Sequence, residues 1–289
     1  MRQDQIISVV GIVAALLLAM PIAYLGSQNG ASFAGLPVFM LCGLVAFIVQ
    51  WVMFIPAWIY HTEHYFDLTG SLTYITLTIF ALLTAGLGNE RALLIGALVM
   101  IWATRLGSFL FIRISKAGED RRFRKMKMNF LQFLMTWTLQ GLWVYITYAA
   151  GLAAMTSVAE VPIGPIAIAG AALWALGFGI EVVADRQKTA FRKDPSNQDK
   201  FIQSGLWAWS RHPNYFGEIM LWCGIMVIAI PVLEGLQYAT LISPIFVIVL
   251  LTKISGVRML ENRAEKLWGN DPEYQKYKAT TPSLIPLPK

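Results

Sequence analysis

The densest group of chemically active side chains is the stretch Ser-Arg-His-Pro-Asn-Tyr-Phe-Gly-Glu at residues 210–218. Its proline suits the first turn of a helix, where a missing N–H costs nothing. Arg211 and His212 then stand at the helix N-terminus, which attracts anions. Asn214 and Glu218 are four residues apart, so they share one face of that helix. We therefore expect a charged ligand at the N-terminus of this helix.

Four charged residues upstream follow one another at spacings of four, three and four. On a helix these spacings place all of them on one face. They are Glu181, Asp185, Lys188 and Arg192. Two acids and two bases along one stripe form either a ladder of ion pairs or one wall of a ligand site. The spacing alone leaves both interpretations open.

Arg105 is a charged residue deep inside a predicted membrane helix. It lies eight residues before the helix exit at Arg113, which is about 12 Å along a helix. Charged groups within a span are costly and are functional candidates by default. The alternative is that Arg105 snorkels, or pairs with a neighbour and so stabilises the bundle. A last charged group follows the final predicted span and consists of Glu261, Arg263 and Glu265.

The elements that must position these residues are membrane helices. Of 289 residues, 56% are hydrophobic and 14% are charged, whereas soluble domains carry about 25% charged residues. Apolar runs of roughly 18 residues or more predict membrane spans. We expect an all-α integral membrane bundle of seven or eight helices, with a polar cofactor cavity open to the cytoplasm. The expected helices cover 5–25, 37–60, 71–87, 91–113, 129–150, 164–185, 213–232 and 237–256.

The basic residues are concentrated in three loop or tail segments, 116–127 (which includes Arg121), 186–211 and 253–278. The 151–163 connection carries only Glu160 as a charged residue. Cytoplasmic loops carry an excess of Lys and Arg, so the three basic segments are predicted to face the cytoplasm, with Arg2 on the same side. The net charge of +6 then reflects membrane topology and not nucleic-acid binding. A bacterial inner membrane is the expected location.

The two cysteines, Cys42 and Cys223, lie in apolar runs. Their spacing matches neither a metal site nor a thiol-redox motif. Free cysteines commonly behave as small apolar residues. We therefore expect no metal.

The segment Asn-Tyr-Phe-Gly-Glu-Ile-Met-Leu-Trp-Cys-Gly, residues 214–224, resembles the C-terminal region of the steroid 5-alpha-reductases. The resemblance includes Gly-Ile-Glu ending at Glu181, Gly-Leu-Trp ending at Trp207, and a Tyr-x-x-Tyr stretch near the C-terminus. It covers residues 91–289 well and residues 1–90 poorly. We expect residues 1–90 to contribute to a substrate pocket and residues 91–289 to form a reductase-like domain that binds the cofactor.

The resemblance implies NADPH buried among the cytoplasmic halves of the last helices. The implied cofactor-binding residues are Glu181, Asp185, Arg192, Arg211, His212, Asn214, Tyr215, Glu218 and Glu261. Glu181 stands where the mammalian steroid enzymes have Asn. A glutamate donates a hydrogen bond only when it is protonated, so the exact steroid chemistry does not carry over at this position.

The implied reaction is hydride transfer to the β carbon of an enone, with the carbonyl oxygen polarised as charge develops on it. In the steroid enzymes a Glu and a Tyr hold this carbonyl. Asp67 is the best match for the Glu, with Glu63 second. Arg105 aligns by spacing with the family's Tyr, and Tyr65 is a further hydrogen-bond donor. The expected substrate is a 3-oxo-4-ene steroid or a similar enone lipid.

Two other functions remain open. Isoprenylcysteine carboxyl methyltransferases, which use S-adenosylmethionine, also show Arg-His-Pro followed by Tyr and Gly, and a C-terminal Glu. The Asn-Tyr-Phe-Gly-Glu continuation and the charged stripe that ends at Arg192 favour the reductase. A lipid-binding or scaffolding protein is disfavoured, because structure alone does not need so many costly charges on one side. The expected partners are a small lipophilic substrate and membrane lipid; the sequence identifies no protein partner.

Overall fold

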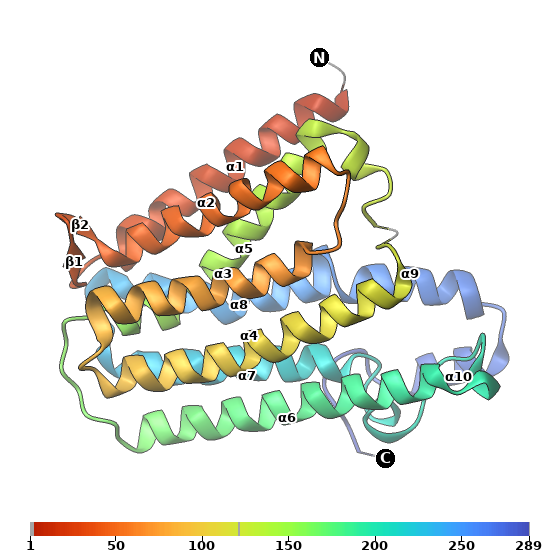
Figure 1. Ribbon diagram of the computed structural model, residues 1–289. Helices are drawn as coiled ribbons and strands as arrows, with labels where there is room; N and C mark the ends of the chain where they lie inside the picture. Colours follow the sequence, from red (N-terminus) through yellow and green to blue (C-terminus); the bar gives the residue numbers. More distant parts are fainter. Residues whose placement is uncertain (1–2, 121, 289) are drawn as a thin grey trace. The chain divides into compact units, whose positions relative to one another are not determined.

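The computed structural model describes residues 3–120 and 122–288, and this part of the chain is mostly helical (Figure 1). Its named strands form one small antiparallel hairpin of β1 (Ser32–Phe33) and β2 (Leu36–Pro37). The predicted all-α membrane class is confirmed. Arg2 and Arg121, which counted towards the predicted basic side, lie outside the described residues.

The eight predicted helices each correspond to a helix of the structure, in the same order, and the last two helices of the described chain lie beyond the last predicted one. The α-helices are α1 (Gln3–Gly26), α2 (Val38–Ile59), α3 (Phe66–Ala81), α4 (Glu90–Ala117), α5 (Phe130–Thr156), α6 (Pro165–Lys193), α7 (Pro213–Ala229), α8 (Ile242–Val249), α9 (Val257–Trp268) and α10 (Pro272–Thr280). Two π-helical turns, η1 (Leu82–Gly86) and η7 (Leu250–Ile254), extend α3 and α8. Short 3₁₀ turns are η2 (Met126–Met128), η3 (Pro195–Asn197), η4 (Gly205–Ala208), η5 (Ile230–Val232) and η6 (Gly235–Leu241).

By its internal contacts the chain divides into two compact units. Unit 1 comprises Met1–Gly164 and Ile228–Ser243, and unit 2 comprises Pro165–Val227 and Pro244–Lys289. The predicted boundary after residue 90 marked where a sequence resemblance begins, and not a change in packing. That boundary remains a prediction about function.

Seven helical segments of the described chain are long and apolar enough to cross a membrane. They are Gln3–Gly26, Val38–Ile59, Phe66–Gly86, Glu90–Ala117, Pro165–Lys193, Pro213–Val232 and Gly235–Trp268. The predicted span at 129–150 corresponds to α5, which is long enough but not among these seven. α5 packs against α1, α2, α3 and α4 in unit 1, and most of its residues are buried. A helix shielded from lipid by protein tolerates polar residues.

The polar residues around α5 form hydrogen bonds between helices. The amide of Gln50 on α2 donates to the Thr73 hydroxyl on α3 at 2.9 Å. The indole of Trp51 donates to Thr138 on α5 at 3.1 Å. Such side-chain bonds contribute to helix association inside a membrane, where water does not compete for them. Together with the contacts of α5 to α1, α2, α3 and α4, they hold the helices of unit 1 around α5.

Arg91, in the first turn of α4, is almost fully buried, with 1% of its surface exposed. Its Nη1 donates to the backbone oxygen of Ile228 at 2.6 Å. Its Nη2 donates to the oxygens of Pro162 at 3.0 Å and Val161 at 3.2 Å. One guanidinium therefore satisfies three carbonyl groups and ties α4 to two distant segments of unit 1.

In unit 2, α6 and α7 run side by side (Figure 1) and meet at glycines. A β carbon built on Gly217 would lie 2.5 Å from the backbone oxygen of Gly177. One built on Gly224 would lie 2.7 Å from the oxygen of Gly170. The two backbones are therefore nearly in contact, as is common where small residues line a membrane-helix interface. This packing fixes the two helices that carry most of the predicted cofactor residues.

Candidate functional site

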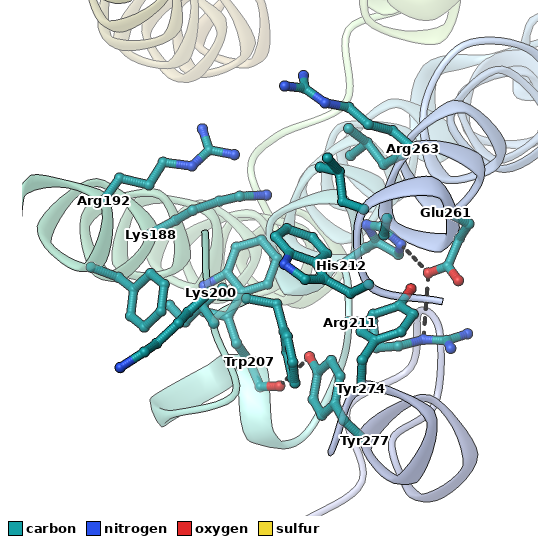
Figure 2. A pocket seen from close by; sticks show the side chains of 17 residues that line it. Lys188, Arg192, Lys200, Trp207, Arg211, His212, Glu261, Arg263, Tyr274 and Tyr277 are labelled. Carbon is teal, nitrogen blue, oxygen red and sulfur yellow. Dashed lines mark hydrogen bonds and ion pairs between the residues drawn. The ribbon is translucent and has the colours of Figure 1, made fainter. Parts of the chain in front are cut away.

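Unit 2 contains a pocket lined by the C-terminal end of α6, the segment 200–212, α9 and α10 (Figure 2). Its charged lining is dominated by cations: Lys188, Arg192, Lys200, Arg211 and Arg263. Aromatic rings form much of the remaining wall: Phe191, Phe201, Trp207, Trp268, Tyr274 and Tyr277. Glu261 is the acid among its described lining residues. A pocket of this composition suits an anionic ligand that also carries flat rings.

The one acid is already paired within the pocket. An oxygen of Glu261 lies 2.8 Å from Nε2 of His212 and 3.4 Å from Nε of Arg211 (Figure 2). Burial lowers the pKa of His212, and its hydrogen bond to Glu261 offsets this only in part. The imidazole is therefore neutral near pH 7, with Nε2–H donating to the carboxylate. Nδ1 is then an acceptor, and it is buried without a hydrogen-bond partner among the described residues.

The predicted charged stripe on α6 extends to the pocket. The predicted helix end at residue 185 was wrong, because α6 continues to Lys193. Its basic last turn is favourable, since cations stabilise the carbonyl end of a helix. Glu181 and Asp185 are buried, whereas Lys188 and Arg192 line the pocket. The ammonium of Lys188 lies 4.3 Å from the centre of the Trp207 ring.

The motif on α7 joins this stripe. α7 begins at Pro213, as predicted. The Asn214 amide donates to Asp185 at 3.3 Å, which links α7 to α6. The Tyr215 ring stacks on His212 with centroids 5.8 Å apart. Glu218 follows one turn further along α7 and is partly buried.

The two acidic candidates for the substrate carbonyl lie in unit 1, in different surroundings. Glu63 is buried and accepts hydrogen bonds from Lys127 Nζ at 2.7 Å and from the backbone N–H of Asp120 at 2.8 Å. These contacts hold the α2–α3 loop against the α4–α5 loop. Asp67, in the first turn of α3, has two looser cationic neighbours, Arg113 and Arg122, each at 3.9 Å.

The other two candidates are Tyr65 and Arg105. The Tyr65 hydroxyl is buried and has no hydrogen-bond partner in the described chain. Burial raises the pKa of this phenol, so it remains a donor at neutral pH. The guanidinium of Arg105 lies 5.2 Å from the centre of the Phe109 ring. α4 runs to Ala117 and not to residue 113 as predicted, which places Arg105 about 18 Å from the helix end.

Several pocket residues were not singled out as ligand-binding from the sequence, notably Lys200, Phe201 and Trp268. The signal available for them was the mixture of aromatic and basic residues in the 200–212 and 257–278 segments. Arg91 also went unnoticed. An arginine in the first turn of a helix opposes the helix dipole, and this is a sign that it has a specific buried partner.

Seven apolar helices and a cationic, aromatic pocket characterise the chain as a multi-pass membrane protein with a candidate anion site. It belongs to the family described as "Protein of unknown function (DUF1295)", whose model matches residues 53–281. This family is related to steroid 5-alpha-reductase-like proteins. The match begins upstream of the predicted resemblance and includes all of the candidate residues, from Glu63 to Glu261. Neither the curated proteins nor the solved structures compared with the chain give a match.

Proposed function

We propose that this protein is a membrane-embedded, NADPH-dependent reductase of the carbon–carbon double bond of a 3-oxo-4-ene steroid or a similar enone lipid. The observation that carries the proposal is the pocket of unit 2, where five cations meet six aromatic rings and the one described acid is already paired. Arg and Lys side chains bind phosphate groups, and Arg does so bidentately. Aromatic rings accept a base by stacking.

The residues fit the cofactor in a second respect. Nδ1 of His212 is a buried acceptor that lacks a donor, and the ribose hydroxyls of a dinucleotide are donors of the required kind. The pocket has about 170 Å³ of free volume, less than the roughly 300–1,000 Å³ of sites that enclose a whole drug-sized ligand. We therefore assign the phosphate-bearing end of NADPH to it, with Arg192 and Arg211 as phosphate ligands.

When bound, NADPH supplies a hydride to the β carbon of the enone. The protein must then stabilise negative charge at the carbonyl oxygen and deliver a proton. Tyr65 supports this role as a buried hydroxyl without a partner, and Asp67 as an acid that is less tightly paired than Glu63. Arg105 remains a third candidate for polarising the oxygen. The contacts of Glu63 favour a role in holding two loops together.

The positive charge of the pocket lining argues against the methyltransferase alternative. S-adenosylmethionine carries a sulfonium cation, which five lining cations would repel, whereas the phosphates of NADPH would be attracted. By the positive-inside rule, the basic segments that line the pocket belong on the cytoplasmic side, where NADPH is available. The bacterial inner membrane remains our proposed location.

Arg192→Ala and Asn214→Ala are expected to weaken NADPH binding about tenfold or more, because each removes a contact to a charged group or to its support. The measurement is titration of the detergent-purified protein with NADPH, followed by the fluorescence of the cofactor. Arg186→Ala is the matched control, because Arg186 is an exposed arginine of α6 that does not line the pocket. Equal affinity in both variants and the control would refute the cofactor assignment. Release of S-adenosylmethionine in place of NADP(H) from the purified protein would select the methyltransferase.

Asp67→Asn is expected to lower turnover of an enone steroid by about a hundredfold, within the range of general acid–base effects, and to leave the affinity for NADPH unchanged. The measurement is the rate of NADPH oxidation with saturating substrate. Tyr65→Phe is assayed in parallel, because it removes a single hydroxyl. Full activity of Asp67→Asn would transfer the proposed role to Tyr65 or Arg105.

A further inference from the structure

The last residues of the described chain run back along the segment that precedes α7. The backbone N–H of Arg211 donates to the oxygen of Pro282 at 3.0 Å. The N–H of Leu287 donates to the oxygen of Trp209 at 3.0 Å. We call residues 281–288 the C-terminal strap. Its hydrogen bonds to residues 209–211 hold it beside the segment that carries two pocket residues, Arg211 and His212.

Ser210 is the residue through which the strap reaches His212. Its side chain is fully buried. The hydroxyl donates to the oxygen of Leu284 at 2.8 Å, and it accepts the backbone N–H of His212 at 3.1 Å. A serine hydroxyl has one donor and two acceptor positions. The Ser210 hydroxyl therefore donates its hydrogen bond to the strap and accepts one from the pocket residue His212. It joins the two through one atom.

α10, which leads into the strap, fixes the same segment from another side. The Tyr277 hydroxyl donates to the oxygen of Trp207 at 2.6 Å. The guanidinium of Arg211 donates to the oxygen of Lys278 at 3.3 Å. The segment from Trp207 to His212 has little regular structure beyond the short turn η4. The Trp207 indole bonds to the oxygen of Ala184 on α6, and the bonds to the C-terminal residues hold the remainder of the segment, residues 209–211, which sets where Arg211 and His212 point.

We propose that the C-terminal strap positions Arg211 and His212 in the pocket, with Ser210 as the positioning residue that couples the strap to His212. Ser210 does not line the pocket, so it acts through its neighbours and does not touch the ligand. The consequence for ligand binding rests on the proposed function, because NADPH is the ligand considered. The positioning itself stands on the hydrogen bonds alone.

The test compares Ser210→Ala with Ser283→Ala in the full-length protein in detergent. Ser283→Ala is the matched control, because Ser283 contributes its backbone oxygen and not its hydroxyl to this region. Leu287→Pro is the second variant, because it removes the N–H that bonds to Trp209 without changing a buried side chain. Hydrogen exchange of residues 208–216 is measured by mass spectrometry, and NADPH affinity by fluorescence titration.

We expect Ser210→Ala and Leu287→Pro to speed exchange in residues 208–216 while α7 beyond this range is unchanged. We also expect Ser210→Ala to weaken NADPH binding about tenfold, as the loss of a buried hydrogen-bonding group does. Unchanged exchange in Ser210→Ala and Leu287→Pro would overturn the proposal that the strap positions Arg211 and His212. The same increase in exchange in Ser283→Ala would overturn it as well. If both variants exchange faster but the wild-type protein does not bind NADPH, the positioning role of the strap is supported and the proposed function is rejected.

Discussion

A methionine in place of Arg91 is expected to destabilise the protein by about 3 kcal/mol, because three carbonyl oxygens, one of them buried, lose their donor at once and a buried side chain loses its hydrogen bonds. These oxygens belong to Val161, Pro162 and Ile228. Methionine fills most of the volume, so the loss reports on the hydrogen bonds more than on packing. The expected result is a clear drop in the thermal unfolding midpoint in detergent.

Arg186→Met is the control for this substitution, because Arg186 is exposed on α6 and its loss should leave the midpoint nearly unchanged. Arg91→Lys keeps the positive charge but cannot reach three oxygens, so an intermediate midpoint is expected. A midpoint of Arg91→Met equal to that of the wild type would mean that water satisfies the three carbonyls instead.

Gly217→Ala is expected to separate α6 from α7. The new β carbon would lie 2.5 Å from the backbone oxygen of Gly177 and 2.7 Å from the backbone nitrogen of Glu181. No side chain can move aside to relieve this contact, because the obstructing atoms belong to the main chain. Overpacking of a well-packed interface costs about 1–3 kcal/mol. NADPH affinity should fall as well, because the Asn214–Asp185 bond spans the same interface.

Gly179→Ala provides the matched control on α6, since a β carbon built there meets nothing within 4 Å. Alanine favours a helix over glycine by up to about 1 kcal/mol, so this variant should be neutral or slightly more stable. The measurement is again the thermal midpoint, together with NADPH titration. Equal behaviour of the two variants would show that the helices are not in close contact at Gly217.

The sequence predicted the helices well, because hydropathy reports directly on contact with lipid. α5 was predicted at 129–150 and lies at Phe130–Thr156, although it carries glutamine, threonine and tyrosine. The ends of the helices were predicted less well. The end of α6 was placed eight residues too early, because charged residues at Asp185 and beyond resemble a loop although they continue the helix to the pocket.

The candidate site was predictable only in part. The motif around His212 stood out because its residue types are dense and its proline marks a helix start. The pairing of His212 with Glu261 was not visible, because 49 residues separate them in the sequence. The same holds for Arg91, whose partners are backbone atoms that carry no sequence signal. Contacts between distant segments depend on the fold, which local spacing does not encode.

The polarity of α5 also bears on how the protein enters the membrane. Polar side chains on α5, among them Thr138 and Gln140, are buried, and such groups are costly in a membrane unless protein neighbours accept their hydrogen bonds. α1 to α4 precede α5 in the chain and are synthesised first, so they are available when α5 leaves the ribosome. Membrane integration of α5 is then expected to be cooperative, and a chain that lacks the earlier helices should integrate this segment less efficiently.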